Sequence, residues 1–333
     1  MIPGDIGIEL GLRASGTWRP APAGAGGAPG TYATSLPFRL ARASGADPAE
    51  VAEGLAGRLR GVAWIAGMSV TGGYLTVTVT DVALTALAVR IPGAGPACAA
   101  SDALSGTEIT APPPADLTTA ASWPQASRLV AAAVTARLAG AAGATVLAGP
   151  GPPRPRPGPG APAAAVAYAG PDAIRYALAR ARPGAPGRVE ARRCVREGNP
   201  NPFFAVRYAH ADAASVLRWA ADLGIDRGPP EALRPGRLAH ATERALLALM
   251  SWLPERTASA ARRRRPDAFS RYLEHLAGAW LDCREACPAL PFGGRAAPRD
   301  EAGAAARLWL AAAAQTALGT GLALLGVAAP ERL

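Results

Sequence analysis

From residue 171 onward, apolar residues recur every three or four positions, which is the spacing of helices that bury one face. The stretch 266–287 shows this most clearly, because Phe269, Leu273, Leu276, Trp280 and Cys283 form one continuous stripe. The expected helices span residues 172–182, 202–223, 238–253, 266–287 and 302–325, with prolines at positions 254, 266, 288 and 330 as boundaries. We therefore predict an all-α helix bundle over residues 171–333.

Residues 1–95 show a different pattern, typical of a small α+β module. Asp47, Pro48 and Glu50 place an N-cap acid, a proline and a second acid where a helix should begin. Residues 74–80 then alternate between apolar and threonine side chains, which predicts a half-buried strand. Asp81 can cap a closing helix that runs to about residue 90.

The middle of the chain, residues 96–170, is less regular. Short strands are expected at 108–110 and 145–147, on either side of an alanine-rich helix at 125–140. Residues 149–162 are almost entirely Gly, Pro and Arg, which predicts a disordered linker. We interpret this region as a degenerate α/β remnant.

The net charge of the chain indicates a possible class of binding partner. The 333-residue chain has a formal net charge of +10, and its sequence contains arginine but no lysine. Guanidinium groups favour planar, bidentate contact with phosphate, so a polyanion partner is plausible. High-G+C coding bias is the open alternative, since Ala, Gly, Pro and Arg dominate throughout.

Several chemistries are excluded or disfavoured. A P-loop needs a lysine on the phosphates, and the chain has none. Cys283 and Cys287 lie one helical turn apart, but His275 is too distant along the helix to complete a zinc site, so we expect core cysteines and no metal. Residues 308–327 are interrupted by Trp309, Gln315 and glycines, so we expect no membrane span, and no signal peptide is apparent. We expect reduced thiols and a soluble, cytoplasmic protein.

Ordered motifs resemble a known family. Residues 30–41 read G-T-Y-A-T-S-L-P-F-R-L-A, residues 71–76 read T-G-G-Y-L-T, residues 171–178 read P-D-A-I-R-Y-A-L, and residues 201–212 read N-P-F-F-A-V-R-Y-A-H-A-D. The end of the chain has R-L-W-L at 307–310, G-L-A-L-L-G-V at 321–327 and P-E-R-L at 330–333. This order resembles arginyl-tRNA synthetases, with their N-terminal additional domain and DALR-type anticodon-binding domain. The resemblance is good at both ends and poor over residues 96–170.

The resemblance also shows what is missing. That family's class I catalytic domain carries H-x-G-H and K-M-S-K-S signatures, which stabilise the phosphates of ATP. The three histidines, at 210, 240 and 275, cannot form the first signature, and without lysine the second is impossible. We therefore expect no catalytic residues and no cofactor. The leading hypothesis is a non-catalytic paralogue that binds tRNA or a tRNA-like RNA. The alternatives are a residual or trans-complemented arginine–tRNA ligase, which would need ATP, and a protein–protein scaffold on the ancestral RNA surface.

The resemblance implies candidate RNA-binding residues. In the C-terminal bundle, Tyr208, Asp212, Ser215 and Arg218 share one helix face. In the family pattern an arginine stands at the position of Asp212, so we expect this carboxylate to repel phosphate, a change that favours a protein partner. The remaining candidates are Arg207, His210, Leu333, Ser35, Phe38, Arg262, Arg263, Arg264 and Arg265. Tyr208 and His210 could instead be helix-packing residues, Phe38 a core residue, and the arginine run a solvated loop.

Overall fold

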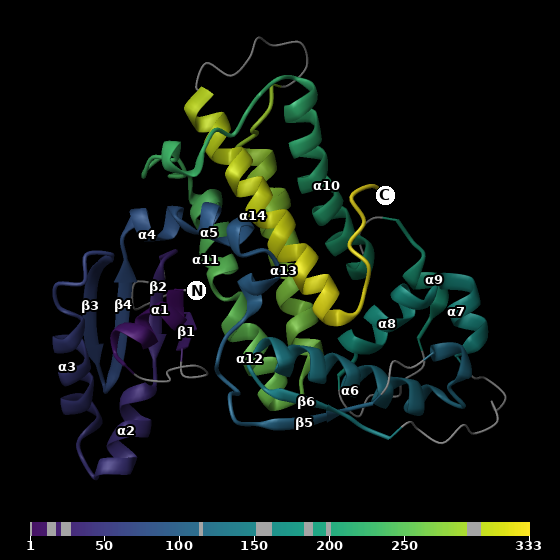
Figure 1. Ribbon diagram of the computed structural model, residues 1–333, viewed down its shortest axis with the longest axis horizontal. Coiled ribbons are helices and arrows are strands. Elements are labelled where there is room, and N and C mark those ends of the chain that lie inside the picture. Colours follow the sequence, from purple (N-terminus) through teal and green to yellow (C-terminus); the bar gives the residue numbers. More distant parts are fainter. Residues whose placement is uncertain are drawn as a thin grey trace.

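The computed structural model describes residues 2–11, 18–20, 28–112, 116–150, 162–182, 189–197, 201–291 and 301–333. Figure 1 shows an N-terminal sheet with its helices on one side and a large group of helices on the other. The fold is mixed α and β and mostly helical. The expected linker 149–162 lies largely outside the described residues.

The N-terminal module contains a four-stranded antiparallel sheet in the order β1-β2-β4-β3. Its strands are β1 (Trp18–Pro20), β2 (Thr31–Thr34), β3 (Ile65–Thr71) and β4 (Tyr74–Val79). The alternation in β4 is confirmed, because Leu75, Val77 and Val79 are buried. Helices α2 (Leu36–Ser44) and α3 (Pro48–Leu59) pack on the sheet, and α1 (Ile2–Glu9) precedes it.

The expected helix start at residue 47 is also confirmed. The Asp47 side chain accepts a hydrogen bond from the Ala49 amide at the beginning of α3. The predicted closing helix, however, is divided into α4 (Asp81–Thr85) and α5 (Leu87–Ala94), and the 3₁₀ turn η2 (Gly95–Ala99) follows. These elements extend the module into the helical region, since α5 and η2 pack against the last helix of the chain.

The middle region forms a small β-α-β unit. Strands β5 (Glu108–Ala111) and β6 (Thr145–Ala148) pair in parallel and are joined through α6 (Trp123–Ala141), close to the predicted bounds. The turn η3 (Leu117–Thr119) precedes α6, and α7 (Ala163–Ala169) follows β6. All four residues of β6 are exposed, so this pair of strands is far from the buried parallel sheet usual in α/β folds.

The helical bundle contains α8 (Pro171–Arg180), α10 (Pro202–Asp222), α13 (Pro266–Ala286) and α14 (Glu301–Leu325), close to four of the predicted helices. The prediction of one helix over 238–253 is wrong at its end. The structure has α11 (Ala241–Ser251) and then a further helix, α12 (Leu253–Arg263), which the sequence did not suggest. Pro254 lies in the first turn of α12, where a missing amide hydrogen costs nothing, so it helps begin this helix. The short helix α9 (Ala191–Cys194) and the turn η4 (Pro230–Ala232) were also not predicted.

Helix α14 is the centre of the bundle. It packs against α10, α13, α5 and η2, which explains why its sequence is apolar around its whole circumference. By length and composition alone, α14 and the segment Asp81–Ala99 are apolar and long enough to cross a membrane. The apolar window of α14 is 67% buried inside the protein, as in a core helix, and Asp81–Ala99 is divided among α4, α5 and η2.

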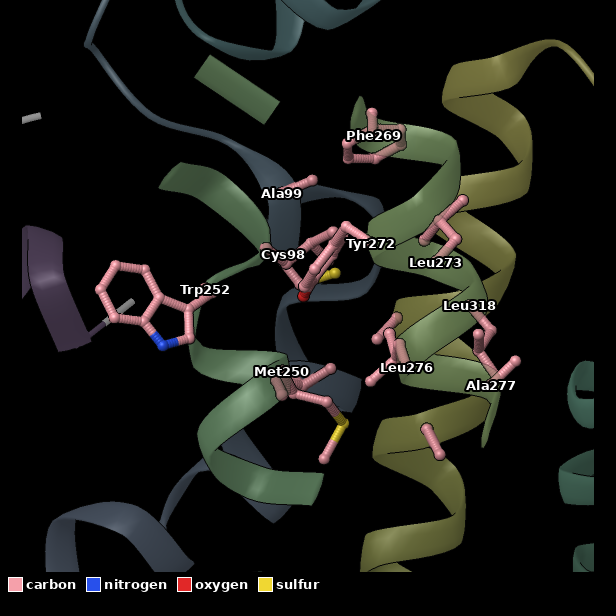
Figure 2. Packing of buried hydrophobic residues seen from close by; sticks show 14 of the residues in the cluster. Cys98, Ala99, Met250, Trp252, Phe269, Tyr272, Leu273, Leu276, Ala277 and Leu318 are labelled. Carbon is pink, nitrogen blue, oxygen red and sulfur yellow. The ribbon is translucent and has the colours of Figure 1, made fainter. Parts of the chain in front are cut away.

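A continuous core joins the N-terminal module to the bundle. Figure 2 shows Tyr272 and Leu276 of α13 on the side of Cys98 of η2 and Met250 of α11, whereas Leu273 points toward α14. At the edge of this core, the Tyr32 hydroxyl of β2 lies 2.8 Å from Ser251 Oγ, and its ring lies 5.3 Å from that of Trp252. The N-terminal module and the helical bundle are therefore in direct contact through buried side chains.

Candidate nucleic-acid interface

Helix α10 carries most of the predicted RNA-binding residues. Asn201 fixes its beginning, because the side chain accepts a hydrogen bond from the Phe203 amide and donates to the carbonyl groups of Cys194 and Arg196. Figure 1 shows α10 beside α14, with the C-terminal segment running next to α10. The arrangement brings residues 206–222 and 327–333 together.

Asp212 does not have the role that its place on the helix suggested. It is 7% exposed, and its carboxylate accepts a hydrogen bond from Trp280 Nε1 at 3.0 Å and forms an ion pair with Arg284 at 3.1 Å. Burial raises its pKa, against the opposing effects of Arg284 and Trp280. The expectation that Asp212 faces the RNA is therefore wrong, because α13 packs over this position and neutralises the charge.

His210 is a packing residue. It is buried, and its Nδ1 donates to the carbonyl oxygen of Pro330 at 2.9 Å, since a carbonyl can only accept. Burial lowers the pKa of the imidazole, although the bond to Pro330 and the nearby Glu331 carboxylate oppose this. Of the two interpretations of His210, helix packing is the one that fits, and its effect is to hold the C-terminal tail on α10.

Arg218 fixes the same tail from the next turns of the helix. Its guanidinium donates to the Glu331 carbonyl oxygen at 2.9 Å and to Ser215 Oγ at 2.7 Å. Ser215 in turn donates to the Ala211 carbonyl oxygen, so the serine hydroxyl is occupied within the helix. Leu333 follows at the end of this tail and is 57% exposed. The structure thus brings Ser215, Arg218 and the tail that ends in Leu333 to one side of α10.

Tyr208 remains accessible, with 41% of its surface exposed, and its ring stacks on Phe204 at 5.7 Å between centroids. Trp219, which the sequence reading missed, is 50% exposed. The two are eleven residues apart, or about three helical turns, so they share one face of α10. That spacing of two large aromatic residues was the signal that could have found Trp219.

A groove of ≈ 990 Å³ lies along this face, between α10 and α13. Its apolar lining includes Tyr208, Trp219, Leu223, Trp280 and Leu281. Its arginines are already paired, because Arg284 binds Asp212 and Arg307 binds the buried Glu243 at 2.8 Å. An aromatic, nearly neutral groove is suited to the flat face of a base more than to a phosphate.

Arg207 is turned away from this groove. Its guanidinium lies over the ring of Phe203, 5.0 Å from the centroid, and burial lowers its pKa. The prediction that Arg207 supplies a guanidinium to the same face as Tyr208 does not agree with this position.

Ser35 and Phe38 lie in the N-terminal module, which Figure 1 places at the opposite side of the molecule from α10. Ser35 precedes α2, and its side chain makes no capping hydrogen bond there. Phe38 is 37% exposed and packs on Tyr74 at 4.8 Å and on the edge of Gly73. These two residues cannot join the site on α10, although Phe38 presents an accessible ring.

The first two residues of the arginine run are helical, and the last two link two helices. Arg262 and Arg263 form the last turn of α12, Arg264 ends it with φ of 52°, and Arg265 precedes α13. Arg265 binds the buried Asp267 with two hydrogen bonds of 2.7 and 2.8 Å. A tight link between two helices has therefore replaced the expected solvated loop.

Among the residues that the structure describes, no group of three His, Cys, Asp or Glu side chains could hold a metal ion. Cys283 and Cys287 are both buried free thiols, and burial raises the pKa of Cys283 to about 12. This agrees with core cysteines.

The geometry defines a helical domain whose first long helix carries exposed aromatic residues and whose last residues return to that helix. Residues 206–333 match the model of the DALR anticodon binding domain. The chain is 39% identical over 168 residues to an arginine–tRNA ligase of Paenarthrobacter aurescens and 39% identical over 171 residues to that of Micrococcus luteus. These matches cover 50% of this chain and 30% of each relative, so the chain matches less than a third of the relatives' length.

The arginyl-tRNA synthetase of Thermus thermophilus has a similar fold, with a TM-score of 0.63 at 15% identity, over 100% of this chain and 99% of that one. By its sequence matches, the protein is an arginyl-tRNA synthetase-related protein with a DALR anticodon-binding domain.

Proposed function

We propose that this protein is a non-catalytic relative of arginyl-tRNA synthetase that binds tRNA through the aromatic groove of α10 and α13. The observation that carries the proposal is the pair of exposed rings, Tyr208 and Trp219, on the helix that opens the anticodon-binding domain. Each offers a π-face on which an unpaired base can stack, with a contribution of about 1–3 kcal/mol per base. Arg218 of the same helix and the tail bound to it supply polar groups beside these rings.

The non-catalytic part rests on chemistry that the sequence lacks. Class I activation of an amino acid needs positive charge on the phosphates of ATP as pyrophosphate leaves. The chain contains no lysine and no pair of histidines in the H-x-G-H spacing. The β5-α6-β6 unit keeps only two parallel strands among the described residues, and all four residues of β6 are exposed although α6 contacts this strand. No described element provides the crevice in which such a sheet binds nucleotides.

The observation that favoured a protein–protein scaffold no longer does so. That alternative depended on Asp212 as an exposed acid on the former RNA surface, and Asp212 is buried and paired with Arg284.

Fluorescence anisotropy with total tRNA in about 150 mM salt tests RNA binding, since affinity for nucleic acid depends on salt. We expect tighter binding to tRNA than to random RNA of equal length. The variant Tyr208→Ala/Trp219→Ala should bind more weakly by about tenfold or more, because two stacking contacts are lost. Tyr168→Ala is the matched control, because Tyr168 is 61% exposed on α7, a different element.

Equal affinity for tRNA and random RNA would refute the proposal, and so would a double variant that binds as the control does. Pyrophosphate exchange with arginine and ATP tests the catalytic part separately. Exchange above background with the purified chain, or after addition of lysate, would support the ligase alternatives instead.

A further inference from the structure

A second cavity lies at the junction of the N-terminal module and the bundle, away from the aromatic groove. Its volume is ≈ 630 Å³, and its walls are the start of β2 with the residues before it, and one face each of α11, α12 and α13. Tyr32, Trp252 and Tyr272 are buried in its floor. We call this cavity the arginine cleft, because Arg256, Arg263, Arg265 and Arg271 line it.

The charge of the arginine cleft is strongly positive. Within the described part of the chain, the carboxylate that contacts these arginines is that of Asp267, which is fully buried and binds both Arg265 and Arg271. Asp267 thereby fixes the positions of two guanidinium groups and cancels one of their charges. Arg256 and Arg263 form no ion pair with any described residue, and both are exposed. Four arginines and one carboxylate leave three positive charges at this surface.

The geometry of α12 separates the two unpaired arginines. Arg256 and Arg263 are seven residues apart, so they lie on the same side of the helix, about 10.5 Å apart along its axis. The positions between them on that side carry the small residues Ser259 and Ala260, which leave the space between the guanidinium groups open. Arg256 is also held over the ring of Trp252 at 5.6 Å, so its position is partly fixed before a ligand arrives.

We propose that the arginine cleft binds the sugar–phosphate backbone of the RNA that the aromatic groove holds by its bases. This rests on the proposed function, which supplies the RNA. Planar guanidinium groups match phosphate oxygens in pairs, and two unpaired guanidinium groups on one side of α12 can each contact a different phosphate of the same strand. The groove is nearly neutral and aromatic, so it contacts bases. The cleft is positive, so it contacts the sugar–phosphate backbone.

Helix α13 connects the two sites. Arg271 lines the cleft, and Arg284 lines the groove thirteen residues later, about 20 Å further along the helix. Thirteen residues turn an α-helix by about 220°, so the two sites lie on nearly opposite sides of α13, and an RNA that occupies both must pass around this helix. Since the sites share no side chain, their contributions to the binding free energy should add.

The chain offers a matched control. Arg262 and Arg264, which the sequence also offered as RNA-binding candidates, are exposed and adjacent to Arg263, but the structure places neither of them in the lining of the cleft. Arg256→Gln/Arg263→Gln and Arg262→Gln/Arg264→Gln change the net charge equally, so long-range electrostatic effects should be similar. We expect the cleft pair to weaken tRNA binding about fivefold or more. It should also reduce the slope of log K against log salt by about 1.5, with a much smaller change in the control pair.

Urea unfolding of each variant checks that the fold is intact. If Arg256→Gln disturbs the packing of Trp252, the salt slopes of the single variants Arg263→Gln and Arg262→Gln are compared instead. These two residues are adjacent on α12, and only Arg263 lines the cleft. Equal salt slopes in the cleft and control variants, with wild-type tRNA binding intact, would overturn the cleft and leave the proposed function standing.

The opposite result is also distinguishable. If tRNA and random RNA bind equally, but the salt slope still depends on the cleft pair, the cleft stands and the proposed function fails. If the wild-type chain binds no RNA, both are overturned. In a combined variant, Tyr208→Ala/Trp219→Ala with Arg256→Gln/Arg263→Gln, additive losses would support two contacts on one RNA.

Discussion

Asp212 allows a sharp test of whether the conspicuous acid on α10 contacts RNA or supports the fold. Its two contacts differ in accessibility: Trp280 is 3% exposed, whereas the Arg284 side chain is 35% exposed. Replacement by alanine leaves the Trp280 N–H buried without its acceptor, at a cost of about 1–3 kcal/mol. Arg284 can turn toward water, so after screening its lost ion pair adds about 1 kcal/mol or less. We expect Asp212→Ala to lower the free energy of unfolding by about 1–4 kcal/mol.

Two further variants sharpen the test. Asp212→Asn keeps an oxygen to accept from Trp280 and removes only the charge, so it should cost about 1 kcal/mol. Asp222→Ala makes the same chemical change at an exposed position of the same helix and should stay within about 0.5 kcal/mol of wild type. Urea unfolding followed by circular dichroism gives the three values, and anisotropy with tRNA is measured where every variant is folded. If Asp212→Ala unfolds like wild type but loses tRNA affinity, Asp212 is an RNA contact and the structural interpretation is wrong.

Two other predictions concern the packing of α14 and the C-terminal tail. Gly321→Ala should destabilise the protein by about 1–3 kcal/mol, because the new methyl group would overlap the fully buried Leu273. Gly278→Ala is the matched change at an open helical position, and it should stabilise the protein by about 0.5–1 kcal/mol. Urea midpoints that shift in the same direction for both would contradict this packing. The lowered pKa of His210 means that the unfolded chain takes up this proton first, so the free energy of unfolding should decline as the pH falls below about 6.5. His210→Gln should make that decline shallower in urea titrations at pH 7.5, 6.5 and 5.5, and an unchanged decline would show that His210 does not cause it.

Local patterns in the sequence were enough for most of the individual elements. The period of the apolar stripe in α13, the alternation in β4 and the N-cap at Asp47 are each set by neighbours a few residues away. The break between α11 and α12 was not visible, because Pro254 is compatible both with the end of one helix and with the first turn of the next. Only the packing of Trp252 against Tyr32 and Arg256 shows how that turn is used.

For the candidate site as well, local sequence patterns determined some features and tertiary packing determined others. The sequence determined that α10 is a helix and that Tyr208, Asp212, Ser215 and Arg218 lie close together on it, since these follow from the helical repeat. The tertiary structure decided which of them are accessible: α13 buries Asp212, the C-terminal tail takes up His210 and Arg218, and Tyr208 and Trp219 remain exposed. It also assembled the arginine cleft from segments more than 200 residues apart. Helical spacing is local and can be read along the chain, whereas burial and charge pairing depend on partners from distant elements, which only the folded chain brings into contact.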